Sequence, residues 1–276
     1  MTVGINLGDM LLQLFGILAT LLVCLYVGFA LYALLFTNMR LFPVPASGYK
    51  DHDGILKLNT ASGLSITATH IEKPLAEYTI LYCHGNSEDL ATIKANYARL
   101  SIHGGYNVLA FDYPGYGTSE GRPNQRNLIE ATEAAYNYLT EEKKIPPGKI
   151  IVYGRSLGGG PATDLTSRKP VGGLVLEQAF TSVYRTVIPF RVLPWDHFDN
   201  LAKIDSIRCP LFILHGGADY TVPSYHGKAL LAKAPEPKIH LWVDYAGHGD
   251  SLLKAAGEDY WKKLGEFQQL VEKQQN

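Results

Sequence analysis

Cysteine is scarce in this sequence. The only three, Cys24, Cys83 and Cys209, are odd in number and widely spaced among 276 residues. No C-x-x-C pair and no cysteine–histidine cluster with zinc spacing is present, which argues against a disulfide framework and against a zinc site. We therefore expect three buried, reduced thiols and a protein that works without a metal ion or a cofactor.

Excess charge of either sign is also lacking. The chain has 25 Lys and Arg against 26 Asp and Glu, a formal net charge of -1, and it contains no basic tract. This balance gives no reason to expect a nucleic-acid partner. With 46% hydrophobic residues, the chain is long enough for one large α/β domain plus a short extra segment of membrane character.

Charge is absent altogether from Met10 to Phe36. As a helix this run would be roughly 40 Å long at about 1.5 Å per residue, which exceeds the ~30 Å hydrocarbon core of a bilayer. A cleaved signal peptide is the alternative, but residues 1–9 contain no Lys or Arg and residues 31–35 form a poor cleavage site. We therefore predict a single-pass transmembrane anchor over 10–36, preceded by a short tail of residues 1–9.

Few charges flank this run. Arg40 and Lys50 follow it and Asp9 precedes it, so the positive-inside rule favours a catalytic domain on the cytoplasmic side. Pro43 and Pro45 forbid helix, and residues 37–49 are expected to be an extended linker. Residues 50–276 are then the catalytic domain.

Apolar runs alternate with helical stretches in that domain. The expected strands are Ile55–Leu58, Ser65–Ile71, Thr79–Cys83, Asn107–Phe111, Ile150–Tyr153, Gly173–Glu177, Leu211–Leu214 and Ile239–Val243. The expected helices are Asp89–Ile102, Gln125–Glu142, Gly158–Ser167 and Glu258–Lys273. Strands without clean alternation, separated by helices, predict an α/β fold with a mostly parallel sheet covered on both faces. Residues 179–205 are too long for a plain crossover and form either a small cap over the site or a segment whose aromatics pack on the sheet.

Ser156 stands in the most informative motif, Gly154-Arg155-Ser156-Leu157-Gly158. The motif follows the apolar run Ile150–Tyr153 and precedes small residues, an order that predicts strand, sharp turn and helix. This is the context that a G-x-S-x-G nucleophile elbow needs, because the turn aims the serine hydroxyl outward and the glycines allow close backbone approach. The N–H of Leu157 would then open a helix, where it can stabilise an oxyanion.

A serine nucleophile needs a base and an orienting acid from loops at the carboxyl ends of strands. His248, between Gly247 and Gly249 after the last expected strand, is the candidate base, while the other histidines are expected to be surface or packed residues. Asp219 lies between Ser156 and His248 in chain order and is the favoured acid, with Glu177 as its rival.

The segment His84-Gly85-Asn86-Ser87 follows the strand Thr79–Cys83. Its glycine permits a tight turn, and the N–H of Asn86 can point to the same place as that of Leu157 and form a two-donor oxyanion hole. We expect His84 to have a structural role. The Gly-rich turn Asp112–Ser119 has no lysine to close a phosphate site and is expected to be a rigid loop that shapes the pocket.

These motifs in this order resemble the α/β-hydrolase superfamily: His84-Gly85-Asn86, Asp112-Tyr113-x-Gly115-Tyr116-Gly117-x-Ser119, Gly154-x-Ser156-x-Gly158-Gly159, His215-Gly216-x-x-Asp219 and Gly247-His248-x-Asp250. More narrowly they resemble its membrane-associated serine hydrolases, a branch that includes protein depalmitoylases, over about residues 50–272. The resemblance implies Ser156 as nucleophile, Asp219 as acid, His248 as base, and Asn86 and Leu157 as oxyanion donors. It departs where depalmitoylases carry an acylated cysteine-rich N-terminus and where relatives often have Asn in place of Gly249.

The sequence thus predicts a membrane-anchored serine hydrolase that forms an acyl-enzyme from an ester or thioester of a lipid or acylated protein. A peptidase or amidase with the same residues is one alternative, and a non-catalytic membrane scaffold is the other. The scaffold is disfavoured because every catalytic position is filled. The pattern specifies neither the acyl chain nor an oligomeric state.

Overall fold

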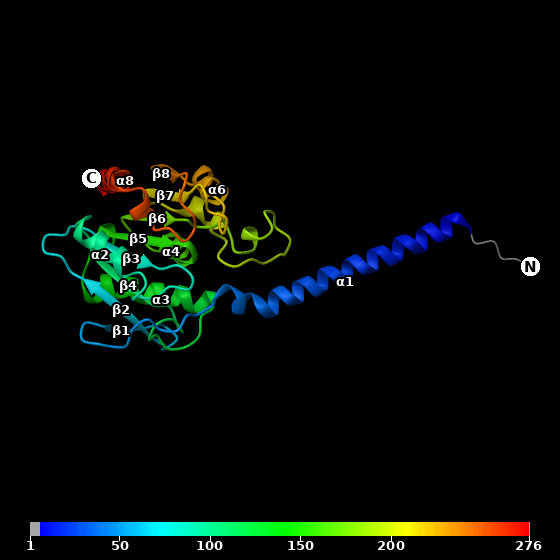
Figure 1. The fold of residues 1–276 in the computed structure, drawn as a ribbon, viewed down its shortest axis with the longest axis horizontal. Helices are drawn as coiled ribbons and strands as arrows, with labels where there is room; N and C mark the ends of the chain where they lie inside the picture. Colours follow the sequence, from blue (N-terminus) through cyan, green and yellow to red (C-terminus); the bar gives the residue numbers. More distant parts are fainter. Residues whose placement is uncertain (1–5, 276) are drawn as a thin grey trace, which may run out of the picture. The chain divides into compact units, whose positions relative to one another are not determined.

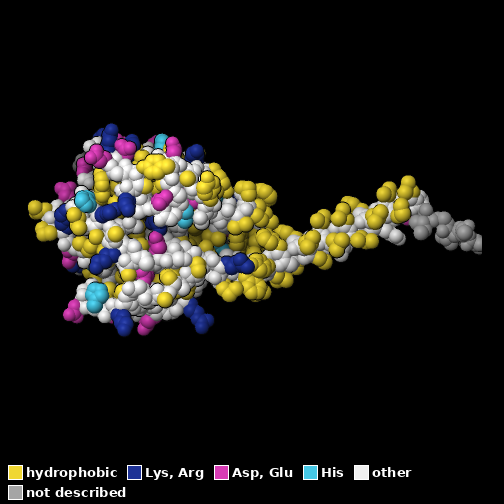
Figure 2. Space-filling view, viewed as in Figure 1, with side chains coloured by type: hydrophobic (Ala, Val, Ile, Leu, Met, Phe, Trp, Pro, Cys, Tyr) yellow, Lys and Arg dark blue, Asp and Glu magenta, His cyan; other side chains and the backbone are white. Residues whose placement is uncertain are grey.

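The computed structural model describes residues 6–275, which fall into two compact units that divide between Leu41 and Phe42. The first unit is a single helix, α1(Leu7–Leu41), whose 35 residues extend beyond the uncharged run at both ends. Its most apolar stretch has a mean hydropathy of 2.5 and none of it is buried. Figure 2 shows apolar side chains along much of its visible face. Cys24 is exposed on this helix, so the expectation that all three thiols are buried was wrong for this one, although all three are free.

The second unit, the α/β unit, holds one eight-stranded sheet (Figure 1). Its strands are β1(Leu56–Asn59), β2(Ser65–Ile71), β3(Thr79–Cys83), β4(Asn107–Phe111), β5(Ile150–Arg155), β6(Gly173–Glu177), β7(Leu211–Gly216) and β8(Lys238–Val243). Its longer helices are α2(Lys94–Ile102), α3(Gln125–Asn137), α4(Gly159–Arg168), α6(Tyr225–Lys233) and α8(Glu258–Gln275), with the short α5(Asn200–Lys203) and α7(Leu252–Ala255).

The strand order across the sheet is β1-β2-β4-β3-β5-β6-β7-β8. Strand β2 runs antiparallel to both β1 and β4, and the pairs from β4 to β8 are parallel. Every residue of β3, β5, β6 and β7 is buried, because helices cover both faces of this part of the sheet. One face packs against α2 and α8 through a core that includes Tyr82, Tyr153 and Phe267. The predicted α/β-hydrolase architecture is therefore confirmed.

The helices differ from the sequence prediction in two boundaries and in the elements that were missed. The helix expected from Asp89 begins only at Lys94, because Asp89 and Thr92 hydrogen-bond to each other's backbone N–H groups and form a separate turn. The helix expected over 125–142 changes at its end into a π-helical turn, η1(Tyr138–Glu142). Helix α6 and the short helices α5 and α7 were not predicted as elements.

In the stretch 179–205, the aromatics at the two ends pack on the α/β unit, as one of the two interpretations expected, and a cap over the site remains a prediction. Phe180 and Phe198 are buried, and a side chain at Gly160 on α4 would collide with the Phe198 ring. Phe190 is 67% exposed and Val187 is 83% exposed. The segment therefore packs its ends on the α/β unit and presents its middle to solvent.

Candidate active site

Ser156 stands at the carboxyl end of β5 with a φ of +49°, in the left-handed region that a non-glycine residue seldom occupies. Two glycines make this turn feasible. A Cβ at Gly154 would lie 2.7 Å from Ala162 Cβ, and one at Gly158 would lie 2.1 Å from the carbonyl oxygen of Cys83. The sharp strand-to-helix turn expected from the motif is thus present, and it presses against the end of β3.

Three predicted side chains come together at the carboxyl edge of the sheet. Ser156 Oγ lies 2.9 Å from His248 Nε2, and His248 Nδ1 lies 2.7 Å from Asp219 Oδ2. The residues come from segments after β5, β7 and β8; β7 and β8 are neighbours in the sheet, and β6 separates β7 from β5. An unbroken hydrogen-bond path therefore runs from a carboxylate through an imidazole to a hydroxyl, which can remove a proton from the hydroxyl.

Asp219 is held as an ionised carboxylate. Burial opposes its charge, but hydrogen bonds from His215, His248 and the Val222 N–H more than compensate and hold the pKa of Asp219 well below its usual range. Its Oδ1 accepts the N–H groups of Val222 at 2.7 Å and Thr221 at 3.0 Å, which leaves Oδ2 directed to the imidazole. The carboxylate is thereby fixed in both position and charge.

Glu177, the rival acid, is engaged elsewhere. Its Oε2 accepts the Tyr153 hydroxyl at 2.6 Å and its Oε1 accepts the Leu252 N–H at 3.1 Å. The imidazole of His248 has its Nδ1 on Asp219 instead.

The loop after β3, residues 84–90, adjoins the serine turn. The carbonyl oxygens of Cys83 and His84 would lie 2.1 Å and 2.7 Å from a Cβ at Gly158, so the two backbones touch. Asn86 is oriented by the Tyr116 hydroxyl, which donates to Asn86 Oδ1 at 2.9 Å. Leu157 is the second residue of the turn η3(Ser156–Gly158) that leads into α4. The two expected oxyanion donors therefore lie on segments in direct contact.

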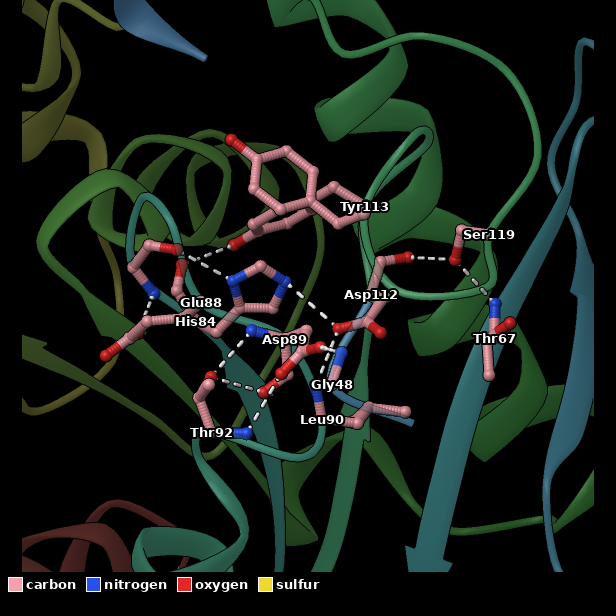
Figure 3. Close-up of polar contacts among 12 residues, drawn as sticks. Gly48, Thr67, His84, Glu88, Asp89, Leu90, Thr92, Asp112, Tyr113 and Ser119 are labelled. Carbon is pink, nitrogen blue, oxygen red and sulfur yellow. Dashed lines mark hydrogen bonds and ion pairs between the residues drawn. The ribbon is translucent and has the colours of Figure 1, made fainter. Parts of the chain in front are cut away.

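His84 and Asp112 form a buried polar centre below this loop (Figure 3). His84 Nδ1 donates to the Gly85 carbonyl at 2.8 Å, and its Nε2 lies 3.4 Å from Asp112 Oδ1. Burial lowers the pKa of His84 and raises the pKa of Asp112 to about 7. Figure 3 also shows Asp89 joined to Gly48, whose N–H donates to Asp89 Oδ2 at 2.7 Å. These residues brace the loop and stand apart from the Ser156–His248–Asp219 path.

Sequence reasoning missed two side chains that support the base. Gln178 Nε2 donates to the Gly247 carbonyl at 2.7 Å, and Arg155 Nη2 donates to the His248 carbonyl at 3.1 Å. The signal for Arg155 was its place as a charged residue at the end of an otherwise apolar strand. Gln178 carried no such signal.

Solved structures share this architecture. The Pyrococcus furiosus esterase Pf2001 aligns with a TM-score of 0.69 at 20% identity and covers 83% of this chain and 99% of that one. An esterase domain from a Rhodothermus marinus protein aligns with a TM-score of 0.59 at 20% identity, over 77% of this chain and 96% of that one. The fold is therefore that of the α/β hydrolases.

Sequence relatives define the family further. The human alpha/beta hydrolase domain-containing protein 17B is 34% identical over 231 residues, which are 82% of this chain and 79% of that protein. The alpha/beta hydrolase domain-containing protein aho-3 of Caenorhabditis elegans is 36% identical over 196 residues, and the match covers 70% of this chain but only 58% of that protein. A family profile described as Chlamydia CHLPS protein matches residues 62–172. The chain belongs to the family of alpha/beta hydrolase domain-containing protein 17.

Proposed function

We propose that this protein is a membrane-anchored serine hydrolase that cleaves ester or thioester bonds of acylated or lipidic substrates. The observation that carries the proposal is the hydrogen-bond path Asp219–His248–Ser156, whose serine has left-handed backbone geometry at the end of a strand. Membership in an α/β-hydrolase family supports it.

In this mechanism Ser156 Oγ attacks the substrate carbonyl carbon while His248 Nε2 accepts the hydroxyl proton. The N–H groups of Asn86 and Leu157 stabilise the oxyanion that forms, and Asp219 stabilises the imidazolium. The bond to the leaving oxygen or sulfur then breaks, and His248 returns the proton to that atom. Water, deprotonated by His248, hydrolyses the acyl-enzyme and restores the serine.

The buried thiols do not compete as nucleophiles in this mechanism. Burial raises the pKa of both Cys83 and Cys209 to about 12, so each remains a protonated thiol at neutral pH. A thiol in that state is a poor nucleophile, and neither cysteine neighbours an imidazole in the hydrogen-bond path. Serine is therefore the nucleophile that the site supports.

The apolar helix supports the proposed substrate class. Helix α1 is long and apolar enough to cross a bilayer, and we propose it as a single-pass anchor with the α/β unit on the cytoplasmic side. The chain enters the α/β unit beside the site, since the Pro43 carbonyl accepts a hydrogen bond from Ser87 Oγ at 3.3 Å and Ser87 follows Asn86. A hydrolase tethered to a membrane meets acyl groups held in or near that membrane at a raised local concentration, which favours them as substrates.

Activity-based labelling tests the proposal. The full-length protein in detergent should react with a fluorophosphonate probe and hydrolyse p-nitrophenyl esters, and Ser156→Ala should abolish labelling and lower kcat by roughly 10⁴–10⁶. Matched thioester and anilide substrates separate the proposal from its alternatives. Preference for the anilide would assign a peptidase or amidase, and a folded wild type that neither labels nor turns over would assign a scaffold.

A further inference from the structure

Arg155 separates the glycine of the elbow from its serine and has no role in the mechanism above. It is the last residue of β5, and its side chain is only 9% exposed. The guanidinium has three polar neighbours. Nη1 forms an ion pair with Glu88, Nη2 donates to the His248 carbonyl at 3.1 Å, and Nε lies 3.9 Å from Glu177 Oε1.

The contact with Glu88 continues into the loop after β3. The second oxygen of Glu88, Oε2, accepts the Gly85 N–H at 2.6 Å, one residue before Asn86. A Cβ on Gly85 would lie 2.8 Å from Glu88 Oε2 and 3.2 Å from Arg155 Nη1, so glycine makes room for the ion pair. Through Glu88, the guanidinium of Arg155 therefore holds the loop residue next to Asn86, the proposed oxyanion donor.

The contact with Glu177 reaches the other side of the base. Arg155 and Glu177 are paired residues of the neighbouring strands β5 and β6. Glu177 Oε1 accepts the N–H of Leu252, which begins α7 four positions after His248. The segment that carries His248 is thus held at its carbonyl by Arg155 directly and at its end through Glu177.

Electrostatics keep this group charged in its buried position. Burial opposes the charge, but the carboxylates of Glu177 and Glu88 more than compensate and raise the pKa of Arg155 above its usual value. A planar guanidinium can bind several acceptors at once in a fixed geometry, which a lysine ammonium does with less directional control. Buried ion pairs add little net stability compared with apolar packing, so the arrangement is better explained by geometry than by stability.

We infer that Arg155 is a positioning residue that sets the distance between the nucleophile turn, the loop of the oxyanion donor Asn86 and the segment of the base His248. The inference rests on the proposed function for its kinetic consequence. Beyond that function, the inference states that Arg155, the residue before the nucleophile, aligns the Asn86 loop and the His248 segment with Ser156. Small misalignments of this kind reduce the rate of the chemical step more than they weaken substrate binding.

Kinetics of four variants test this alignment. Arg155→Met keeps the apolar stem and removes the guanidinium, and we expect kcat to fall about 10–100-fold with KM changed by less than about threefold. Arg155→Lys should recover part of the loss, and Glu88→Gln, which retains an acceptor for Gly85, should lose less than Arg155→Met. The control is Arg126→Met, because Arg126 is 81% exposed and pairs with Glu130 on one helix turn. It should match the wild type.

Hydrogen exchange gives a readout that does not depend on activity. We expect Arg155→Met to speed amide exchange in residues 85–90 and 246–252 and to leave β3 and α8 unchanged. If Arg155→Met does not fold, Arg155→Lys and Glu88→Gln carry the same test. Wild-type kcat in these variants, or a rise in exchange spread over the whole α/β unit, would overturn the inference. A wild-type protein that neither reacts with the probe nor turns over substrate would contradict the proposed function instead. The exchange pattern would then still test whether Arg155 holds residues 85–90 and 246–252 in place.

Discussion

Replacement of Asp112 by asparagine should make stability less sensitive to pH. The carboxyl is completely buried, its Oδ2 accepts the Tyr49 hydroxyl at 2.5 Å, and its Oδ1 accepts the Leu90 N–H at 2.9 Å. Burial, the largest effect, raises its pKa from 3.8 to about 7. Near pH 5 the folded protein therefore holds a proton on Asp112 that the unfolded chain has already lost.

The sign and size of the effect follow from linkage. A raised carboxyl pKa contributes stability that is complete below about pH 4 and is lost as pH rises to the folded pKa near 7. Each pH unit in this window costs about 1.4 kcal/mol of unfolding free energy, so the wild type should lose about 2–3 kcal/mol between pH 5 and pH 8 relative to Asp112→Asn. Other titrating groups are common to both proteins and largely cancel in the difference.

Denaturant unfolding of the two full-length proteins in the same detergent, at half-unit steps from pH 5 to pH 8, measures this difference. Asp53→Asn, a change at an exposed aspartate, is the control and should run parallel to the wild type. Parallel curves for the wild type and Asp112→Asn would show that Asp112 is ionised in the folded state across the window, and the argument from burial would fail.

Two further predictions concern the acid and the anchor. Asp219→Asn should lower kcat by about 10⁴-fold, because it removes the carboxylate that selects the His248 tautomer. Glu177→Gln should lower kcat far less. If steady-state kinetics gave the reverse order, Glu177 rather than Asp219 would be the acid. Residues 42–276 alone should hydrolyse a soluble short-chain ester but lose much more activity on a membrane-embedded substrate, while the full-length protein stays in the membrane fraction through carbonate washing. Equal losses on both substrates would make α1 part of the active fold, and a mature form that starts after residue 36 would identify it as a signal peptide.

Local sequence signals were sufficient for most of the sheet. Runs such as Asn107–Phe111 and Gly173–Glu177 have apolar interiors because parallel strands are buried on both faces, and their boundaries match the structure. Strands β5 and β7 continue further than predicted, through Arg155 and Gly216. Arg155 and Gly216 do not continue the apolar pattern, so the sequence did not assign them to strands. Both lie at the carboxyl edge of the sheet, where the site residues also lie.

The candidate site was predictable where chemistry demands a residue type in a fixed context. Ser156, His248 and Asp219 each follow a strand in the order that α/β hydrolases use, and glycines mark their loops. The contacts of Arg155 were not predictable, because they join residues 67 and 93 positions apart. Such contacts depend on strand order and loop conformation, which a linear pattern does not contain.

The residues that follow α1 pack as part of the α/β unit. Residues 37–49 were expected to be a linker, but the helix continues to Leu41 and the following residues are bonded to the α/β unit. Ser87 Oγ donates to the Pro43 carbonyl, the Gly48 N–H donates to Asp89, and Tyr49 donates to Asp112. Their partners all belong to the loop that carries Asn86 or to the buried centre that braces it. These bonds tie residues 43–49 to the loop that we propose stabilises the oxyanion, so mutations in this stretch should lower kcat, and their effect should be measured separately from any effect on the proposed membrane attachment.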